Sequence, residues 1–245
     1  MLEMRIQMVG TGSAFAKRYF NNNALIEGDG CRFMLDCGVT GPTALHKAGI
    51  TFGELDGLLI SHIHADHVGG VEEYAFQMKF IYGRKPLLYV PEPLIETLWE
   101  NTLRGGLQQE ESQTLDSYFQ VVPLMEGKET DIGPGISVEM IRTRHMPGKA
   151  SFSFLLNGRF FYSADMVFDR PLLEQLDERG IEIIFHDCQL HPPGQVHATL
   201  EELLTLPERI QEKIRLMHYG DDMEQFIGST GRMSFVEQNR IYSLD

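Results

Sequence analysis

Hydrophobic positions along the chain follow two patterns, short apolar or alternating runs and runs with helical spacing. Short runs bounded by turn residues predict strands, and apolar residues at i, i+3 and i+4 predict helices. The strand pattern covers residues 5–10, 24–27, 32–36, 58–60, 87–90, 119–122, 136–142, 152–156, 159–163, 181–185 and 215–217. The helical pattern covers residues 42–48, 71–82, 94–103, 172–179 and 199–206, with Thr199 as the N-cap of the last.

The order of these elements indicates an α/β protein. Strands and helices alternate in two similar halves, with no linker rich in Pro, Gly and Ser between them. We therefore predict one domain, residues 1–245, in four layers with helices outside and two sheets inside (αββα). Gly28-Asp29-Gly30 predicts a hairpin turn, and residues 233–242 predict a closing strand or hairpin. The polar stretch from Arg104 to Asp116 is the best candidate for a mobile loop or an interaction element.

Composition and charge narrow the class of protein. The chain has 245 residues, 42% hydrophobic and 23% charged, which is typical of a globular protein. Its formal net charge of −14 disfavours nucleic-acid binding, because phosphate contacts need a basic surface. Three widely spaced cysteines argue against a disulfide framework and suit a reducing cytoplasm. No apolar run approaches the ~20 residues of a membrane span, and the start lacks the apolar run of a signal peptide.

The most informative feature is the string Ser61-His62-Ile63-His64-Ala65-Asp66-His67, which follows an apolar strand and precedes a helix. Strand residues two apart point the same way, so His62 and His64 can face one ion. The turn that follows aims Asp66 and His67 at a neighbouring point. Imidazole nitrogens and carboxylate oxygens are the ligands of Zn²⁺ and similar divalent cations. This dense group therefore predicts a metal site.

Further candidate ligands follow later strands. His145 comes after the strand at 136–142, Asp165 after the apolar residues 160–162, and His218 after the strand at 215–217. We expect these three side chains at the same edge of the sheets as the first cluster. Each could instead be an ordinary structural residue, and the pattern leaves that alternative open.

Together these residues resemble the motif set of the metallo-β-lactamase superfamily, over nearly the whole chain. The matching positions, in the family's order, are Asp36, His62-x-His64-x-Asp66-His67, His145, Asp165 and His218. The resemblance implies two divalent metal ions, Zn²⁺ foremost and Mn²⁺ as the alternative. It assigns His62, His64 and His145 to the first ion. It assigns Asp66, His67 and His218 to the second ion, with Asp165 as the bridge and Asp36 orienting a histidine ligand from behind.

Two such ions imply hydrolysis. Metals ~3.5–4 Å apart can clamp the attacking and leaving oxygens of an in-line displacement. They would also lower the pKa of a bound water to ~7 and so supply hydroxide at neutral pH. Asp66 would hold or deprotonate that water. This chemistry suits phosphodiesters.

Other motifs resemble the tRNA 3′-processing endonuclease, tRNase Z, and its relatives. They are Gly10-Thr11-Gly12-Ser13, His186-Asp187 and His197-Ala198-Thr199. The resemblance implies that His197 is a general acid for the leaving group and that Asp187 orients it. The alternatives are that His197 only begins a helix and that Asp187 is an unconnected loop carboxylate.

The chain also departs from tRNase Z. His145 and Asp165 are too close in sequence for that enzyme's long basic arm, and the net charge disfavours tRNA. The remaining resemblance is to the anti-Pycsar phosphodiesterases, which destroy cyclic mononucleotide signals. It implies hydrolysis of cCMP, cUMP, cAMP and cGMP to 5′-monophosphates, for phage immune evasion or for cellular turnover. A tRNase Z-like RNA endonuclease, a lactone or thioester hydrolase and a non-catalytic nucleotide-binding module are the alternatives.

Substrate contacts and assembly follow from the same resemblance. Tyr19, Phe20, Asn23 and Tyr82, in loops near the motif, are candidates for contacts to base and sugar, with ordinary packing as the alternative for the aromatic rings. Enzymes of this branch are often homodimers whose partner loop covers the site. The stretch from Arg104 to Asp116 would be that lid, with a plain surface loop as the alternative.

Overall fold

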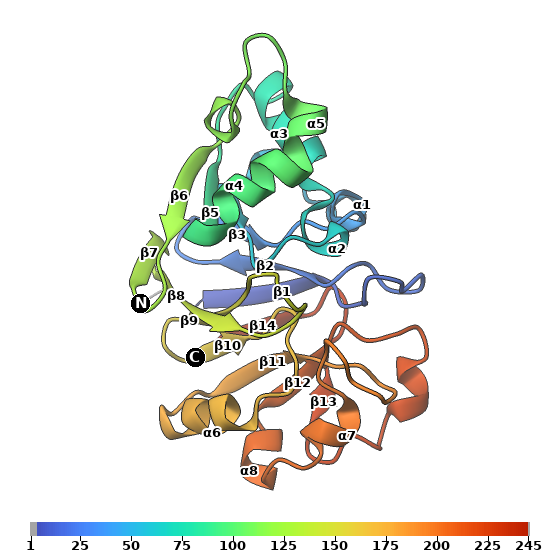
Figure 1. Ribbon diagram of the computed structural model, residues 1–245. Helices are drawn as coiled ribbons and strands as arrows, with labels where there is room; N and C mark the ends of the chain where they lie inside the picture. The colour runs from blue at the N-terminus through green and yellow to red at the C-terminus, as the bar shows by residue number, and fades with distance from the viewer. Residues whose placement is uncertain (1–3, 245) are drawn as a thin grey trace.

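Two facing β-sheets form the centre of the molecule (Figure 1). The computed structural model describes residues 4–244. The first sheet runs in the order β14 (Ile241–Leu244), β1 (Met4–Gly10), β2 (Asn23–Glu27), β3 (Arg32–Leu35), β4 (Gly57–Leu59), β5 (Leu87–Pro91) and β6 (Gln120–Leu124). The second runs in the order β13 (Ser234–Phe235), β12 (Ile214–Met217), β11 (Ile183–Asp187), β10 (Phe160–Tyr162), β9 (Ser151–Leu156), β8 (Ile136–Thr143) and β7 (Glu129–Gly133).

Helices cover the outer face of each sheet, as Figure 1 shows, which confirms the predicted four-layer α/β fold. On the first sheet lie α1 (Gly41–Lys47), α2 (Ala65–Val68), α3 (Val71–Phe80), α4 (Ile95–Leu98) and α5 (Arg104–Leu107). On the second lie α6 (Arg170–Glu178), α7 (Leu200–Leu203) and α8 (Glu208–Gln211). A single π-helical turn, Trp99–Leu103, joins α4 to α5.

Buried apolar strands and capped helices explain the local structure. Every residue of β9 and β10 is buried, as expected for strands covered on both faces. The Asp169 side chain accepts a hydrogen bond from the Leu172 backbone N–H and so caps α6. Thr199 caps α7 through a reciprocal pair of contacts with Glu202, which confirms the predicted N-cap.

Both sheets contain a parallel part whose strands end beside the candidate site. Strands β3 to β6 run parallel to one another, and so do β10 to β13. The carboxyl ends of parallel strands share one edge of a sheet, and ligand sites gather there. The chain leaving β4 carries His62, the chain leaving β10 carries Asp165, and the chain leaving β12 carries His218.

The structure differs from the predicted elements in several places. Strand β7 was not predicted, because its sequence, Glu-Thr-Asp-Ile-Gly, contains a single apolar side chain and lies at a sheet edge. The tail is not a hairpin, since β13 pairs with β12 while β14 pairs with β1 of the other sheet. The predicted helix at 199–206 is shorter, and a separate helix, α8, follows it. Arg104–Leu107 is helical and not a loop, because the helix continues through the π turn.

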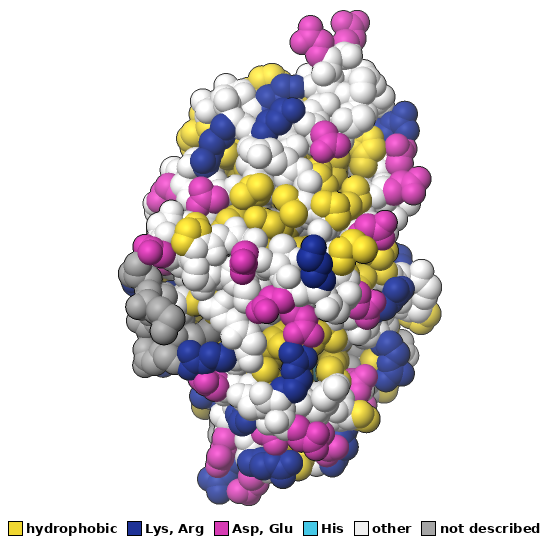
Figure 2. All heavy atoms as spheres, turned by 90° about the vertical axis from the view of Figure 1, so that its left-hand side faces the viewer, with side chains coloured by type: hydrophobic (Ala, Val, Ile, Leu, Met, Phe, Trp, Pro, Cys, Tyr) yellow, Lys and Arg dark blue, Asp and Glu magenta, His cyan; other side chains and the backbone are white. Residues whose placement is uncertain are grey.

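The surface and the thiols match the expectations from composition. On the face that carries β6 and β7, Lys and Arg side chains are interspersed with Asp and Glu and form no continuous basic stripe (Figure 2). All three cysteines are free thiols. Among residues 4–244, no helix has the length and apolar character needed to cross a membrane.

Candidate metal centre and adjoining cavity

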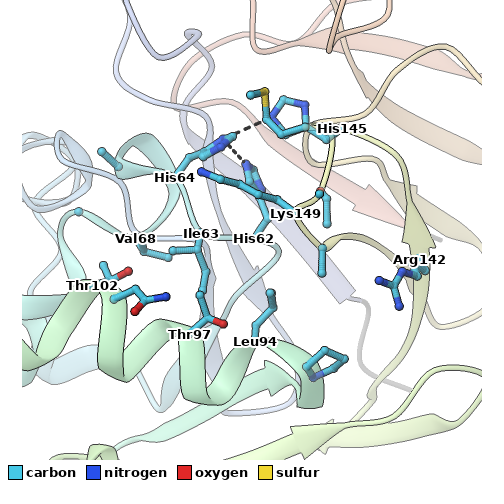
Figure 3. A pocket seen from close by; sticks show the side chains of 18 residues that line it. His62, Ile63, His64, Val68, Leu94, Thr97, Thr102, Arg142, His145 and Lys149 are labelled. Carbon is cyan, nitrogen blue, oxygen red and sulfur yellow. Dashed lines mark hydrogen bonds between the residues drawn. The ribbon is translucent and has the colours of Figure 1, made fainter.

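The histidine string lies on a loop and a short helix. Strand β4 ends at Leu59, so the predicted strand alternation is not what aligns His62 and His64. Instead, His62 forms a single β-bridge with Ser151, and His64 is the residue before α2. Their rings lie close together and line one end of a cavity (Figure 3). The first turn of α2 then carries Asp66 and His67.

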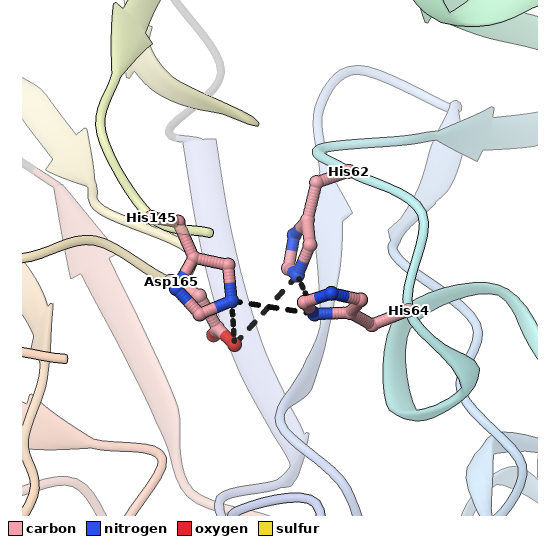
Figure 4. Close-up of side chains that lie close together, drawn as sticks. All are labelled: His62, His64, His145 and Asp165. Carbon is pink, nitrogen blue, oxygen red and sulfur yellow. Dashed lines mark hydrogen bonds and ion pairs between the residues drawn. The ribbon is translucent and has the colours of Figure 1, made fainter. Parts of the chain in front are cut away.

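Three imidazoles and one carboxylate converge in the first group (Figure 4). The Nε2 atom of His62 lies 3.1 Å from Nδ1 of His64, and Nε2 of His145 lies 3.3 Å from the same atom. Oδ2 of Asp165 is 3.7 Å from His62 Nε2 and 3.8 Å from His145 Nε2. These four ligand atoms all lie within 4.8 Å of one another.

A second group adjoins the first and shares Asp165 with it. His67 Nε2 lies 3.3 Å from Asp66 Oδ2 and 3.3 Å from Asp165 Oδ1. His218 Nε2 lies 3.3 Å from Asp66 Oδ2 and 3.4 Å from Asp165 Oδ2. The structure therefore brings together all seven side chains named from the sequence as metal ligands, in two groups that meet at Asp165.

Hydrogen bonds behind the rings leave the inward nitrogens free. The Nδ1 of His67 donates to Asp36 Oδ2 at 2.8 Å, and the Nδ1 of His145 donates to the Val196 carbonyl at 2.7 Å. Ser61 Oγ donates to Asp36 Oδ2 at 2.6 Å, so it can accept from His62 Nδ1, 3.0 Å away. In the neutral form, with its single proton on Nδ1, each of these three histidines can present an unprotonated Nε2 to a cation at the centre.

The backbone around Asp36 holds α2 in place. Asp36 has a left-handed backbone with φ of 57°, and its Oδ1 accepts from the Ser61 N–H at 2.8 Å. Gly38 packs so closely that an added Cβ would lie 1.9 Å from the Asp66 carbonyl oxygen. Asn23 Oδ1 accepts from the Gly38 N–H at 3.0 Å. This polar scaffold fixes where Asp66 and His67 can be.

Burial keeps the first group of histidines neutral. It is the main cause that lowers the pKa of His62 far below the usual value, and the neighbouring His67 adds to the effect. Burial and the nearby His145 lower the pKa of His64 to about 4. Burial also lowers the pKa of His145. Neutral imidazole is the form that binds metal ions.

The second group favours a positive charge. Burial opposes ionisation of Asp66, but the hydrogen bond from His218 and the close contact with His67 lower the pKa of its carboxyl strongly. Burial likewise opposes ionisation of Asp165, and positive charge on His218 and His67 outweighs it and lowers the pKa. Although burial opposes a charge on His67, the carboxylates of Asp165 and Asp36 raise the pKa of His67 well above its usual value. A cation at His67 Nε2 would meet the carboxylates of Asp66 and Asp165, which lie beside that atom.

The nitrogen and oxygen atoms of the two groups cannot all form hydrogen bonds with one another, but they suit divalent cations. His64 Nδ1 faces two imidazole nitrogens and can form a hydrogen bond with only one of them at a time. The Nε2 of His67 and the Oδ1 of Asp165 are buried and have no hydrogen-bond partner among the described residues. Imidazole and carboxylate ligands suit Zn²⁺, Mn²⁺ and related ions. The two groups therefore have the composition and spacing of divalent-metal sites.

A histidine–aspartate pair borders these groups. His197 Nδ1 donates to Asp187 Oδ2 at 2.8 Å, so Asp187 is not an unconnected carboxylate. Burial opposes a charge on His197, but the hydrogen bond and the charge of Asp187 outweigh it and raise its pKa to about 9. The His197 ring centroid lies 4.8 Å from those of His145 and His218. His197 thus faces the cluster with its outer nitrogen available as a proton donor.

A cavity of about 880 Å³ opens beside His62, His64 and His145 (Figure 3). Its lining comes from both halves of the chain, from α2, α4 and the π turn on one side and from residues 142–151 on the other. The described lining residues include Lys149 and Arg142 but no Asp or Glu. A chain with a net charge of −14 therefore holds a locally cationic cavity.

None of the four substrate contacts named from the sequence lines this cavity. Asn23 is fully buried, and its amide is used by Gly38 and by the Asn22 carbonyl. Tyr19 packs edge-on against Tyr219, with ring centroids 5.0 Å apart. Phe20 lies under the Lys47 ammonium, and Tyr82 lines a separate hollow beside Pro42.

Sequence reasoning missed the polar residues that line the cavity besides the histidines, namely Thr97, Asn101, Thr102, Arg142, Lys149 and Ser151. They lie outside the metal motifs. Only Lys149 could have been noticed in the sequence, because it is four positions after the candidate ligand His145. No residue from Arg104 to Asp116 lines the cavity of its own chain. A lid role for that stretch toward a second copy stays a prediction.

Similarity to known proteins agrees with this geometry. The family model described as "Anti-Pycsar protein Apyc1" matches residues 4–242. The chain belongs to the anti-Pycsar protein Apyc1 family. A protein of that name from Paenibacillus harenae is 57% identical over 241 residues, which cover 98% of this chain and 100% of the relative.

Solved structures confirm the metallo-β-lactamase fold. The metallo-beta-lactamase fold protein YhfI from Bacillus subtilis has a TM-score of 0.76 at 14% identity, covering 99% of this chain and 100% of YhfI. Human tRNase Z, short form, has a TM-score of 0.69 at 17% identity, covering 98% of this chain and 99% of the enzyme. At these identities the likeness concerns the fold alone.

Proposed function

We propose that this protein is a metal-dependent phosphodiesterase that hydrolyses 3′,5′-cyclic mononucleotides, among them cCMP, cUMP, cAMP and cGMP, to 5′-monophosphates. Family membership and fold support the broader statement, a metal-dependent hydrolase that degrades cyclic nucleotides. One observation carries the narrower one. Two ligand groups that meet at Asp165 adjoin the His197–Asp187 pair, at the head of a cationic cavity.

The metal ligands divide as the two groups suggest. One divalent cation would be held by His62, His64 and His145. The other would be held by Asp66, His67 and His218, and Asp165 would be shared by both. Cations bound there would act as Lewis acids that neutralise phosphate charge and activate water as the nucleophile at neutral pH. Asp66, whose carboxylate is ionised, can accept a proton from the attacking water or hold it in line.

His197 supplies the proton for the leaving group. When water attacks phosphorus, an oxygen–phosphorus bond forms and the bond from phosphorus to the 3′ oxygen breaks. The 3′ oxygen then needs a proton, and His197, charged through its contact with Asp187, can donate it. The products are a 5′-monophosphate with a free 3′ hydroxyl. Asp187 acts by holding the His197 ring and stabilising its charge.

The size and charge of the cavity support a small anionic substrate. A volume of about 880 Å³ is within the range of small-molecule sites, and its charged lining residues are both cations. A long nucleic acid would instead need basic side chains across the surface. The face in Figure 2 carries interspersed charges of both signs. As the family resemblance implies, we also propose a homodimer that acts in the cytoplasm, where its free thiols would stay reduced.

A substrate panel tests the proposal. Protein loaded with Zn²⁺ or Mn²⁺ should convert cAMP, cGMP, cCMP or cUMP to the 5′-monophosphate. Chromatography measures the product that forms. Asp66→Ala should abolish turnover while the protein stays folded, whereas Glu178→Ala, which removes an exposed carboxylate of α6 outside the cavity, should keep full activity. Precursor tRNA and a lactone complete the panel. Cleavage of either one with all four cyclic mononucleotides left intact would refute the proposal.

A further inference from the structure

The two walls of the cavity carry different kinds of polar group (Figure 3). Lys149 comes from the loop after β8 and extends toward His64, close enough that its charge helps to lower the pKa of that imidazole. The facing wall, built from α4 and the π turn, presents the neutral side chains of Thr97, Asn101 and Thr102. An apolar floor of Ile63, Val68 and Leu94 lies beside them.

The π turn is the reason that Thr97 and Thr102 share this wall. In a regular α-helix, side chains five positions apart are rotated by about 140° from one another. The wider π turn, Trp99–Leu103, takes up that rotation, and both threonines line the same cavity. Such turns are rare and often occur at functional sites.

The polar groups on this wall are available for a ligand. Among residues 4–244, the side chains of Thr97, Asn101 and Thr102 form no hydrogen bond with one another or with any neighbour. A carboxamide carries both donors and acceptors, and hydroxyls serve as either. This combination matches the edge of a nucleobase, and Asn is one of the side chains that pairs with a base through two hydrogen bonds.

We propose that the nucleotide lies across the cavity, with its base read by Asn101 and Thr102 on the π turn and its phosphate held beside the metal ligands by Lys149. This inference rests on the proposed function and adds which residues select the base. The apolar floor would cover one face of the base, and the polar wall would contact its edge. Lys149, a flexible point charge, would attract the phosphate of every cyclic mononucleotide equally.

Asn101→Ala and Thr102→Val test the part that concerns the base. We expect either change to alter the ratio of kcat/KM between the best and the worst of the four cyclic mononucleotides by about fivefold or more. Hydrolysis of bis(4-nitrophenyl) phosphate, which has no base, should not change. Glu100→Gln is the matched control, because Glu100 lies in the same turn but pairs with Arg104 at the surface. Thr102→Val keeps the shape of the side chain, so it reports on the hydroxyl if Asn101→Ala lowers the Tm.

Lys149→Ala tests the part that concerns the phosphate. The kcat/KM should fall about tenfold and equally for all four substrates, and Lys149→Arg should recover most of the loss. Arg144→Ala is the control, since Arg144 belongs to the same segment but is 76% exposed and does not line the cavity.

Two results would overturn the inference. One is that neither Asn101→Ala nor Thr102→Val changes the ratio of kcat/KM between the best and the worst substrate. An equal fall in kcat/KM for all four substrates counts as this result, because it leaves the ratio unchanged. The other is a Lys149→Ala enzyme with unchanged kcat/KM or with an altered base ratio. In both cases the wild-type protein would still hydrolyse cyclic mononucleotides, so the proposed function would stand. A wild-type protein inactive on all four would instead refute the proposed function itself.

Discussion

Asp36→Asn should empty one metal position and leave the other filled. The Asp36 carboxylate is fully buried and does not line the cavity. Its Oδ1 accepts from the Ser61 N–H, and its Oδ2 accepts from Ser61 Oγ and from His67 Nδ1. It therefore acts on the metal centre through the protonation of His67.

Asparagine has one arrangement that avoids a clash with the Ser61 N–H. Its carbonyl oxygen must take the place of Oδ1, because the Ser61 backbone can only donate. The NH₂ group then faces His67 Nδ1, where a carboxylate oxygen stood at 2.8 Å. The Ser61 hydroxyl can turn and accept, but two donors oppose each other at His67. Moving the proton of His67 to Nε2 relieves that contact and removes the lone pair that a cation needs.

The size of the effect follows from what the Asp36 carboxylate provides to His67. Removing such an outer partner of a metal ligand weakens metal affinity about 10- to 100-fold, which is about 1.4–2.7 kcal/mol. Replacing the buried charge also removes a charge-assisted hydrogen bond to His67, which costs about 1.5–3 kcal/mol of folding free energy. The first group, whose rings are held by Val196 and Ser61, should keep its ion.

Metal analysis and calorimetry measure this directly. Dialysed wild-type protein should contain two equivalents of metal per chain and Asp36→Asn about one, with activity falling to the fraction of chains that keep both ions. Asp169→Asn is the matched control, because it makes the same chemical change at a helix cap that asparagine also serves well. A folded Asp36→Asn protein with two tightly bound metals and wild-type activity would refute the assignment of Asp36 and of His67.

Three other changes address the rest of the molecule. His197→Ala should lower kcat on cyclic mononucleotides by about 10²–10⁴-fold at unchanged metal content. The kcat for bis(4-nitrophenyl) phosphate, whose leaving group needs no proton, should fall far less. Equal falls in kcat for both kinds of substrate would contradict the proton-donor role. EDTA should abolish activity and lower the Tm by about 5–15 °C in calorimetry, and Zn²⁺ or Mn²⁺ should restore both; an active apo protein would exclude the metal mechanism. Asp177→Asn should cost about 1 kcal/mol in urea unfolding, because its carboxylate pairs with Arg209 at 2.7 Å and Lys213 at 2.6 Å. These contacts lower the pKa of Asp177, so the difference in free energy of unfolding between wild type and variant should be constant above about pH 5. It should vanish only as the pH falls below about 4. A difference that persisted at about pH 2 would rule out the ion pairs as its cause.

The sequence predicted what depends on local pattern. His145, Asp165 and His218 each follow an apolar strand, and parallel strands bring such positions to one edge. The structure also places a buried acid behind His67, at Asp36. The αββα layers followed from the alternation of strands and helices, because apolar runs in strands and periodic spacing in helices are local signals.

What the sequence could not give depends on distant contacts. Asn23 looked available because it is polar, yet the fold uses its amide to hold Gly38. Asn101 and Thr102 gave no signal, because the face of a helix they occupy depends on a π turn that no local pattern announces. The separation of β13 from β14 follows from pairing across the whole chain.

The position of β14 has a consequence for synthesis of the protein. Strand β1 lies between β2 and β14, so Met4 to Gln7 pair with residues 241–244. On the ribosome, β1 and β2 emerge early and β14 emerges after every other strand. Throughout that interval one edge of β1 keeps its N–H and C=O groups unpaired, which invites pairing with a neighbouring nascent chain. Slow translation or a modified last strand should therefore reduce the yield of soluble protein before it affects the metal centre.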